Sequence, residues 1–296
     1  MPNFTVLSVG AKGDVWSSAD NQTFWLKDIE NPSEFFSMKR REYTEKGLAP
    51  DYLVYNYISA DTTHNCNLRC SFCIDDFSQA TSSRMTREDF VKLISMAEIV
   101  PDGMLFLSCR FEPFLHPRFP EFLSLVPEIG RRKCFFTTNL CVKRFKPDVF
   151  EALANANLHY FNISVDSLTP STFEYLRVNA DFDVFWDNLT NLRKTFAAAK
   201  NPPRLRFISV VVRSNYTEMF DLVRRSHEEF GVVQHEVRMP FTMPYAPKEW
   251  AEHESLTADE WRKLDAHLVA SHLAIKVMPD METARYYGPA IENLSV

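Results

Sequence analysis

Hydrophobic and polar positions along this chain repeat in two alternating patterns. Short runs rich in β-branched and aromatic residues favour strands, and each is followed by a stretch whose apolar residues recur every three to four positions, as on one face of a helix. Alternation of this kind indicates parallel strands joined by right-handed crossover helices. The pattern predicts six strands, over residues 53–58, 104–107, 134–137, 160–165, 205–212 and 232–237.

Capping residues mark where several of the intervening helices begin. Thr86 has Asp89 three residues later, and Thr257 has Glu260 at the same spacing, so each pair can satisfy free backbone amides in the first turn. Pro170 suits the first position of another helix. The helix that follows Thr86 should end before residue 101, and further helices are predicted at residues 119–126, 147–154, 170–177, 185–196 and 217–230.

Six strand-helix units predict an α/β fold, as a barrel, a partial barrel or a doubly wound sheet. In each of these folds the functional residues lie at the carboxyl ends of the strands. Residues 1–52 do not repeat the pattern and are expected to form an N-terminal extension. The main domain is expected to cover residues 53–275, followed by a C-terminal tail over residues 276–296.

Composition and charge narrow the class of protein. The chain is 45% hydrophobic and 24% charged, which is ordinary for a globular protein. Its net charge of −6 argues against nucleic acid as a partner, because binding to phosphate backbones needs an excess of Lys and Arg. No apolar run has the length of a membrane span and the start does not resemble a signal peptide, so a cytoplasmic protein without a membrane partner is expected.

Three of the six cysteines, Cys66, Cys70 and Cys73, lie within eight residues directly after the first predicted strand. Such short spacings suit metal ligation better than a disulfide framework. Three thiolates can ligate three irons of a cubane cluster and leave the fourth iron open. Two alternatives stay open, namely buried cysteines on one helix face and a zinc site with His64 as the fourth ligand. The remaining cysteines are assigned no cluster, and they are Cys109, Cys134 and Cys141.

The spacing C-x3-C-x2-C, with Phe72 directly before Cys73, resembles the signature of the radical S-adenosylmethionine (SAM) superfamily, and the resemblance covers roughly residues 53–273. It implies a [4Fe-4S] cluster on the three cysteines whose open iron binds the amino and carboxylate groups of SAM. It also implies a low-potential reductant such as flavodoxin or ferredoxin, and cleavage of SAM to methionine and a 5'-deoxyadenosyl radical that abstracts a substrate hydrogen. The fold that it implies is a partial (β/α)6 TIM-type barrel, in agreement with the six units.

A segment after the second strand resembles the family's G-G-E-P motif, and in it Glu112 matches the residue that accepts a hydrogen bond from the SAM amino group. A carboxylate suits that role because charge-assisted hydrogen bonds are strong. Arg110 and Phe111 replace the two glycines of the motif, which allow a close approach of the backbone. The alternative for Glu112 is an exposed loop carboxylate, which is the usual state of a Glu side chain.

The ends of the third and fourth strands carry further resemblances to the family. Asn139 lies in a turn similar to T-N-G, with Leu140 in place of the glycine, although Asn at such a turn is also common for local reasons. Ser164, Asp166 and Arg177 resemble an S-x-D segment and a downstream arginine that contact the SAM carboxylate and ribose region, the alternative being a capping Asp and a surface Arg. The cofactor-binding residues implied by the resemblance are Phe72, Glu112, Asn139, Ser164, Asp166 and Arg177.

The resemblance predicts an enzyme, and its core is most similar to members that modify peptides and natural products, so the expected substrate is a peptide or a small molecule. Residues 240–245 after the sixth strand could line a substrate mouth or form a rigid proline loop. No cysteine follows Cys141, so this chain has no thiol set there for the auxiliary clusters of SPASM or twitch domains. Two alternatives are an iron-sulfur electron-transfer protein that does not use SAM and a catalytically degenerate SAM-binding module.

Overall fold

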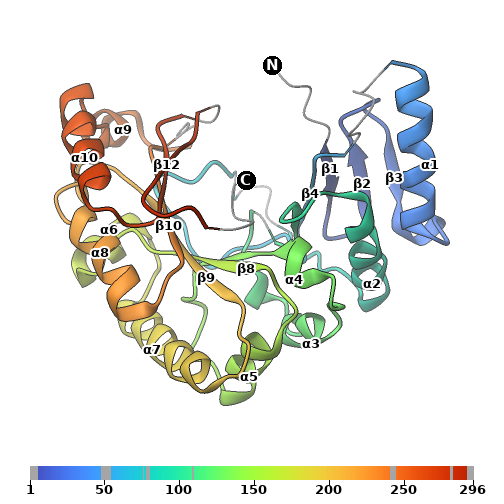
Figure 1. Ribbon diagram of the computed structural model, residues 1–296, viewed down its shortest axis with the longest axis horizontal. Coiled ribbons are helices and arrows are strands. Elements are labelled where there is room, and N and C mark those ends of the chain that lie inside the picture. The colour runs from blue at the N-terminus through green and yellow to red at the C-terminus, as the bar shows by residue number, and fades with distance from the viewer. Residues whose placement is uncertain are drawn as a thin grey trace.

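The protein forms a curved, mainly parallel sheet with its helices on the outer side, as the computed structural model shows in Figure 1. The structure describes residues 6–47, 55–75, 77, 81–108, 110–240, 245–280 and 283–291. Two six-stranded parts of the sheet meet at one strand that is interrupted at Phe136, with β6 (Cys134–Phe135) on one side of the break and β7 (Thr137–Thr138) on the other. The strand order is β3-β2-β1-β4-β5-β6 followed by β7-β8-β9-β10-β11-β12.

All six predicted strands are present and pair in parallel, which confirms the expected partial barrel. The first is shifted relative to its predicted range, which includes two residues outside the described part of the chain. The sheet is open, with β3 at one edge and β12 at the other among the described residues. The predicted strands are β4 (Tyr57–Ala60), β5 (Leu105–Phe106), β6 and β7, β8 (Tyr160–Ser164), β9 (Arg204–Val210) and β10 (Gln234–Arg238).

The predicted helices follow their strands, and the two capping pairs are confirmed. The Thr86 hydroxyl accepts a hydrogen bond from the Asp89 amide at 3.0 Å, and Thr257 and Glu260 form a reciprocal capping box. A 3-10 turn (Met96–Ile99) closes the first helix before Pro101. The predicted helices are α2 (Arg87–Ser95), α3 (Phe119–Ser124), α5 (Pro147–Asn155), α6 (Pro170–Leu176), α7 (Phe182–Ala198), α8 (Met219–Phe230) and α10 (Ala258–Ala270), and two further helices are α4 (Gly130–Lys133) and α9 (Lys248–Glu254).

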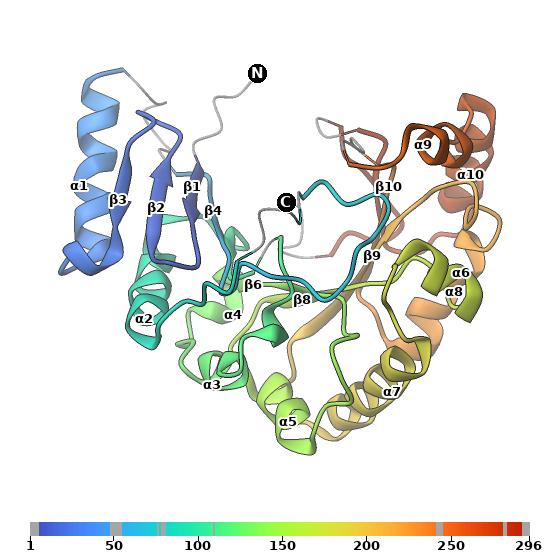
Figure 2. The same ribbon diagram turned by 180° about the vertical axis from the view of Figure 1, so that it is seen from behind.

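The N-terminal residues extend the sheet instead of lying apart from it. Strands β1 (Val6–Val9), β2 (Asp14–Ser17) and β3 (Thr23–Trp25) form an antiparallel unit, followed by a 3-10 turn (Leu26–Asp28) and α1 (Pro32–Glu45). Because β1 pairs in parallel with β4, this unit adds three strands at the edge of the barrel (Figure 2).

The C-terminal end of the sheet also continues beyond the sixth predicted strand. Strand β11 (Ile275–Met278) pairs in parallel with β10, and β12 (Arg285–Tyr287) returns antiparallel to it. The expected boundary after residue 275 falls inside β11, so the division of the chain into three parts stays a prediction.

Alternation of side chains across the sheet separates a packed outer face from an inner face that surrounds a cavity. Phe136 points outward and stacks on Phe161, with ring centroids 5.3 Å apart, and both side chains are fully buried. The neighbouring Phe135 points inward and packs against Tyr160 at 4.8 Å. The helices therefore hold the strands rigidly from outside, while the inner face is free to carry the site.

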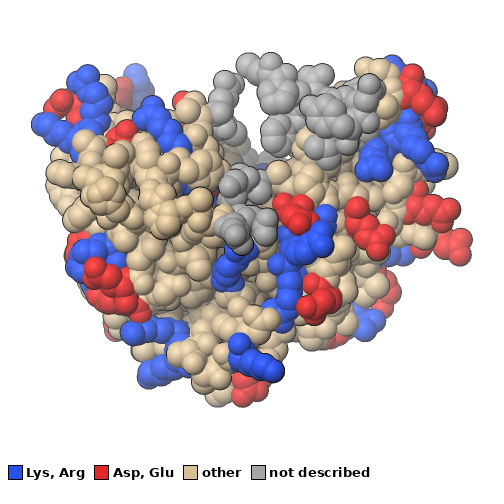
Figure 3. Space-filling model, in the orientation of Figure 1, with Lys and Arg blue, Asp and Glu red and all other residues tan. Residues whose placement is uncertain are grey.

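Charged side chains are interspersed on the outer surface. Lys and Arg lie among Asp and Glu over the face shown in Figure 3. Among the described residues, no helix has both the length and the apolar character needed to cross a bilayer.

Candidate active site

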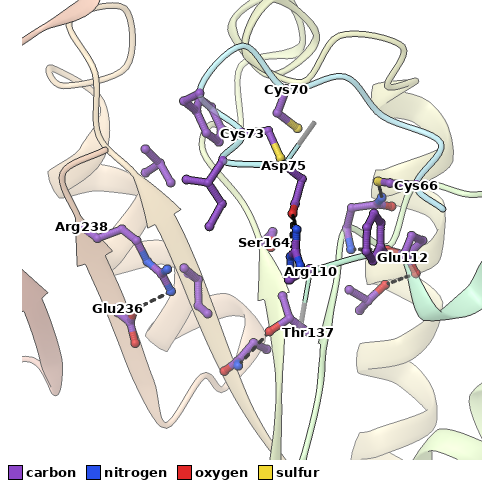
Figure 4. Close-up of a pocket in the computed structure, with 18 of the residues that line it drawn as sticks. Cys66, Cys70, Cys73, Asp75, Arg110, Glu112, Thr137, Ser164, Glu236 and Arg238 are labelled. Atoms are coloured by element: carbon purple, nitrogen blue, oxygen red, sulfur yellow. Dashed lines mark hydrogen bonds and ion pairs between the residues drawn. The ribbon is translucent and has the colours of Figure 1, made fainter. Parts of the chain in front are cut away.

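A cavity of about 540 Å³ lies against the inner face of the sheet, and residues 61–75 after β4, which we call the cysteine loop, cover one side of it (Figure 4). Most of the residues predicted from the sequence lie around it, although they come from four different strand ends. Asp166 is the exception, because it is fully buried and lies outside the lining of the cavity. The predicted residues that line the cavity are Cys66, Cys70, Phe72, Cys73, Glu112, Asn139, Ser164 and Arg177.

The three thiols lie on an irregular loop that follows β4. The Cys73 amide donates to the Cys70 carbonyl at 3.0 Å, which tightens the last turn of the loop. The backbone amides of Arg69 and Ser71 donate to the carbonyls of Val178 and Leu176, at 2.9 and 3.3 Å, so the loop is fastened to the end of α6. Since residues 66–73 are not helical, the alternative of buried cysteines on a helix face is wrong.

The environment of the thiols favours ligation over free thiolate. Burial raises the pKa of Cys66 to about 11 and that of Cys70 to about 12, and burial also raises the pKa of Cys73. Cys66 and Cys70 each lie close enough to another of these thiols for like charge to raise their pKa further. The thiols are therefore protonated at neutral pH until a metal centre displaces their protons.

The donor set fits a [4Fe-4S] cluster with three protein ligands. Within the described part of the chain, no three His, Cys, Asp or Glu side chains converge on one point that could hold a single metal ion. Thiols that bind three separate irons of a cubane do not need to converge in that way. The His64 ring, the fourth ligand of the zinc alternative, packs instead edge-on against Phe111 at 4.5 Å.

The other cysteines do not join this group. Cys134 and Cys141 are buried, and neither lines the cavity. Cys109 lies outside the described residues.

Glu112 is a buried carboxylate in the segment after β5, directly before a 3-10 turn (Pro113–Leu115), and is only 2% exposed, so the alternative of an exposed loop side chain is wrong. Its Oε1 accepts hydrogen bonds from the Thr138 hydroxyl at 2.8 Å and from the Phe114 amide at 3.1 Å, and its Oε2 accepts one from the Asn139 amide at 2.7 Å. Burial raises the pKa of Glu112 to about 7, although these three donors act in the opposite direction. At neutral pH this carboxylate is poised to accept a further donor from a ligand.

Asn139 ties the turn after β7 to the cysteine loop. Its Nδ2 donates to Asn67 Oδ1 at 2.9 Å and lies 3.8 Å from Cys66 Sγ, while its Oδ1 accepts from the Cys141 amide at 2.8 Å. The next residue, Leu140, has a φ of 56° and a fully buried side chain. It thus adopts the left-handed conformation for which glycine is favoured, and its buried side chain offsets the cost.

The residues that replace the two glycines both contact the cysteine loop. Arg110 Nε donates to Asp75 Oδ1 at 2.6 Å, and the backbone amide of Arg110 donates to Asp61 Oδ1 at 3.0 Å. Phe111 is 5% exposed and packs on His64. Arg110 and Phe111, which stand where the family motif has two glycines, therefore connect the segment after β5 to the cysteine loop.

Arg177 lines the cavity in front of Asp166. Arg177 Nη2 lies 2.6 Å from Asp166 Oδ2, and Asp166 Oδ1 accepts a hydrogen bond from the Val210 amide at 2.7 Å. Burial raises the pKa of Asp166 while the Arg177 charge lowers it. This arrangement fixes the guanidinium of Arg177, and Asp166 acts on the cavity only through it.

Several residues of the site were not found from the sequence. They lie on the inner face of β8 to β11 at alternate positions, opposite the cysteine loop. The available signal was the alternation of polar residues in strands that were predicted to lie inside a barrel. The missed residues are Asn162, Arg206, Glu236, Arg238 and Lys276.

Comparisons with known proteins identify a similar family, similar sequences and a similar fold. Residues 61–200 match the family described as the Radical SAM superfamily. GTP 3',8-cyclase of Microcystis aeruginosa is 25% identical over 208 residues, covering 68% of this chain and 62% of that protein. The chain thus spans less than two thirds of that relative's length.

Solved structures show the same fold. SuiB of Streptococcus suis, in a crystal structure with bound S-adenosylmethionine, superposes with a TM-score of 0.57 at 12% identity, covering 95% of this chain and 72% of SuiB. SuiB bound to its precursor peptide SuiA superposes with a TM-score of 0.56, also at 12% identity, covering 93% of this chain and 71% of that one.

Proposed function

We propose that this chain is a member of the radical SAM superfamily, whose family model matches residues 61–200, and that it reductively cleaves SAM and abstracts a hydrogen atom from a substrate in the cavity. The family uses a [4Fe-4S] cluster with SAM, and the ligands proposed here are Cys66, Cys70 and Cys73. The observation that supports the proposal best is that these thiols and the buried carboxylate of Glu112 line one cavity.

Cys66, Cys70 and Cys73 would hold the cluster, which would supply the electron that splits SAM into methionine and a 5'-deoxyadenosyl radical. Around it, Glu112 is proposed to accept a hydrogen bond from the SAM amino group, because one of its oxygens already faces the Asn139 amide beside the cysteine loop. Arg177, fixed by Asp166, is proposed to bind the SAM carboxylate or ribose. Phe72, Asn139 and Ser164 are proposed to shape the remaining SAM site.

The barrel interior is proposed to protect the radical from side reactions. The inner face brings together aromatic rings, with Phe106 and Phe135 stacked at 4.3 Å and Tyr57 edge-on to Phe106 at 6.2 Å. Such walls exclude water, which is the contribution that a protein makes to cofactor chemistry of this kind.

The substrate is proposed to be a small molecule or one segment of a peptide. A cavity of about 540 Å³ falls in the usual range for small-molecule sites. The similar proteins differ in this respect, since one is named for a reaction of GTP and SuiB was crystallised with a precursor peptide. The electron is proposed to come from a low-potential donor such as flavodoxin or ferredoxin, in the reducing cytoplasm where thiols remain free.

The direct test is anaerobic. The protein is reconstituted with iron and sulfide, reduced with dithionite and mixed with SAM, and 5'-deoxyadenosine is measured. We expect the wild type to form it, Cys70→Ala to lose both cluster and product, and Cys134→Ala to keep them, because Cys134 lies on the sheet away from the cavity lining.

Two other outcomes would support a different function. A cluster whose EPR spectrum is unchanged by SAM would indicate an electron-transfer protein. SAM binding without cleavage, with an intact reduced cluster, would indicate a degenerate module. Either result would overturn the proposal.

A further inference from the structure

The wall of the cavity opposite the cysteine loop carries an unusual concentration of positive charge. Arg206 on β9, Arg238 on β10 and Lys276 on β11 all line the cavity, together with the carboxylate of Glu236. Figure 4 shows Arg238 and Glu236 on the far side of the cavity from Cys66 and Glu112. We call Arg206, Arg238 and Lys276 the basic wall.

Register explains why these side chains meet. Glu236 pairs with Ile208 on one side and with Lys276 on the other, and side chains two residues apart on a strand share a face. Arg206 and Arg238 therefore lie on the same inner face as Glu236. The position of the basic wall is set by the sheet, which makes it a rigid part of the cavity.

All three cations contact the same carboxylate. Arg238 Nη2 lies 2.5 Å from Glu236 Oε1, and Arg206 Nη2 and Lys276 Nζ lie 3.1 and 3.5 Å from Glu236 Oε2. The side chains of Arg206 and Glu236 are 4% and 5% exposed, so these charges are largely removed from water. Of the described residues lining this part of the cavity, three are thus cationic and one is anionic.

Glu236 and Lys276 show the effect of this imbalance. Burial alone would raise the pKa of Glu236, but Arg238, Lys276 and Arg206 outweigh it and lower the pKa to about 2. Burial lowers the pKa of Lys276, the neighbouring Glu236 carboxylate raises it, and the two arginines lower it further. Because three cationic side chains surround one carboxylate, the net charge in this part of the cavity is positive.

Arg206 has donor capacity left over. Its guanidinium lies 4.7 Å from the centre of the Tyr160 ring, and its Nε is buried without a hydrogen-bond acceptor. A buried guanidinium with an unused donor is costly, and an anion that approaches it lowers that cost.

We infer that the basic wall binds an acidic group of the substrate, a carboxylate or a phosphate. This inference rests on the proposed function, and it adds the charge of the substrate to it. An acidic group held at Arg206, Arg238 and Lys276 places the rest of the substrate over the aromatic rings, between the wall and the thiols. Glu236 competes with that group for the same donors and offsets part of the positive charge of the wall when no substrate is bound.

The test measures binding of simple anions to the reconstituted protein, kept anaerobic and saturated with SAM so that the SAM carboxylate site is filled. Pyrophosphate and succinate are titrated separately by calorimetry, which distinguishes phosphate from carboxylate recognition. We expect one of the two to bind, and Arg206→Gln and Lys276→Gln to weaken it about tenfold each, as loss of a hydrogen bond to a charged group predicts. Glu236→Gln should tighten it, because a competing negative charge is lost.

The opposite directions expected for these variants separate an anion site from simple misfolding. The control is Arg144→Gln, an exposed arginine paired with Asp187, which should leave anion binding unchanged. Absence of binding by both anions, or equal weakening in Glu236→Gln and Arg206→Gln, would overturn the inference. Formation of 5'-deoxyadenosine is measured on the same samples, so failure of SAM cleavage is seen separately from failure of anion binding.

Discussion

Arg110 and Asp75 form an ion pair across the mouth of the cavity, in which Arg110 Nε lies 2.6 Å from Asp75 Oδ1. Asp75 comes two residues after Cys73, and its side chain is only 3% exposed. The pair therefore joins the end of β5 to one end of the cysteine loop. Phe111 contacts His64 at the other end of the loop, two residues before Cys66, so the dipeptide that replaces two glycines fastens both ends.

We expect Arg110→Ala to loosen the cysteine loop, because it leaves the buried Asp75 carboxylate without this partner. Arg110 itself is half exposed, so solvent screens part of the interaction, and the cost should be about 1–2 kcal/mol. Unfolding in urea measures the cost, and the rate of iron loss to a chelator measures the loosening. The double variant Arg110→Ala with Asp75→Asn should recover most of the lost free energy of unfolding, because the buried charge is then removed as well. A double-mutant cycle that shows no coupling energy between the two positions would contradict this role.

The ionisation of Glu112 should control SAM binding near neutral pH. Since burial raises its pKa to about 7, the ionised carboxylate, which is proposed to accept a hydrogen bond from the SAM amino group, becomes populated as pH rises from 6 to 8. Wild-type affinity should increase over that range, and Glu112→Gln should bind SAM at least about tenfold more weakly at pH 8. Equilibrium dialysis measures the dissociation constant of SAM for both proteins at each pH. Because SAM itself titrates equally in both experiments, its titration cancels in the difference between the two proteins. Parallel pH profiles would show that Glu112 does not contact the amino group.

The same pKa gives Glu112 a cost in stability. Because the folded pKa lies above the ordinary value of 4.5, the folded protein holds this proton more tightly than the unfolded chain. Protonated Glu112 favours the folded state, so its contribution to the free energy of unfolding is complete below pH 4.5. This contribution is lost as pH rises through 7, where the buried carboxylate ionises. A carboxylate kept buried at this cost is consistent with a role in binding.

Asp166 should act as a positioning residue for Arg177. Asp166→Asn keeps an acceptor for the Val210 amide but removes the charge partner of a buried guanidinium, which typically costs about 3–5 kcal/mol. We expect the dissociation constant for SAM to rise while the rate of SAM cleavage at saturation stays close to that of wild type. Arg177→Lys keeps the charge and should weaken SAM binding through lost fork geometry. Unchanged SAM affinity in both variants would remove Arg177 from the SAM site.

Much of the fold could be predicted because its signals are local. The strand-helix alternation and the capping residues Thr86 and Thr257 depend on neighbours within a few positions, and each was found where the sequence places it. The N-terminal strands β1, β2 and β3 escaped prediction because they follow one another as an antiparallel unit with no helix between them, so they lack the strand-helix alternation. Strand β11 was missed because, among the described residues, no helix follows it; β12 returns antiparallel, so β11 does not begin a strand-helix unit.

The residues of the site were likewise predictable where they are close in sequence and were missed where only the fold brings them together. Cys66, Cys70 and Cys73 are close together in sequence, so their spacing was enough to predict them as ligands. The basic wall comes from three strands and looks like ordinary polar alternation in each, so only the order and register of the strands bring Arg206 and Lys276 to one carboxylate. Asp166 shows the converse, since the resemblance to the S-x-D segment placed it in the cofactor site with Ser164, but the strand ends at Ser164 and Asp166 lies behind Arg177. Residues 241–244 of the proline loop lie outside the described residues.

Stability should fall in mild acid because of His235, which is fully buried between two serines. Its Nδ1 contacts Ser226 Oγ at 2.9 Å and its Nε2 contacts Ser209 Oγ at 2.8 Å. Burial, and then the charge of His227, lowers the pKa of His235 from 6.5 to about 3. The unfolded chain therefore binds this proton more readily, so the stability contribution is complete above pH 6.5 and is lost as pH falls toward 3.

The change that tests this is His235→Gln, whose amide can still contact both serines but cannot take up a proton. We expect the variant to be less stable than wild type at pH 7.5, because the amide fills the site less well. Its free energy of unfolding in urea should then fall less than that of wild type between pH 7.5 and pH 5, since the histidine no longer contributes a proton uptake on unfolding. The exposed His253→Gln serves as the control and should keep the full wild-type loss. Equal losses in wild type and His235→Gln would mean that His235 has the same pKa in the folded protein as in the unfolded chain. The two serine contacts and the complete burial of His235 argue against that result.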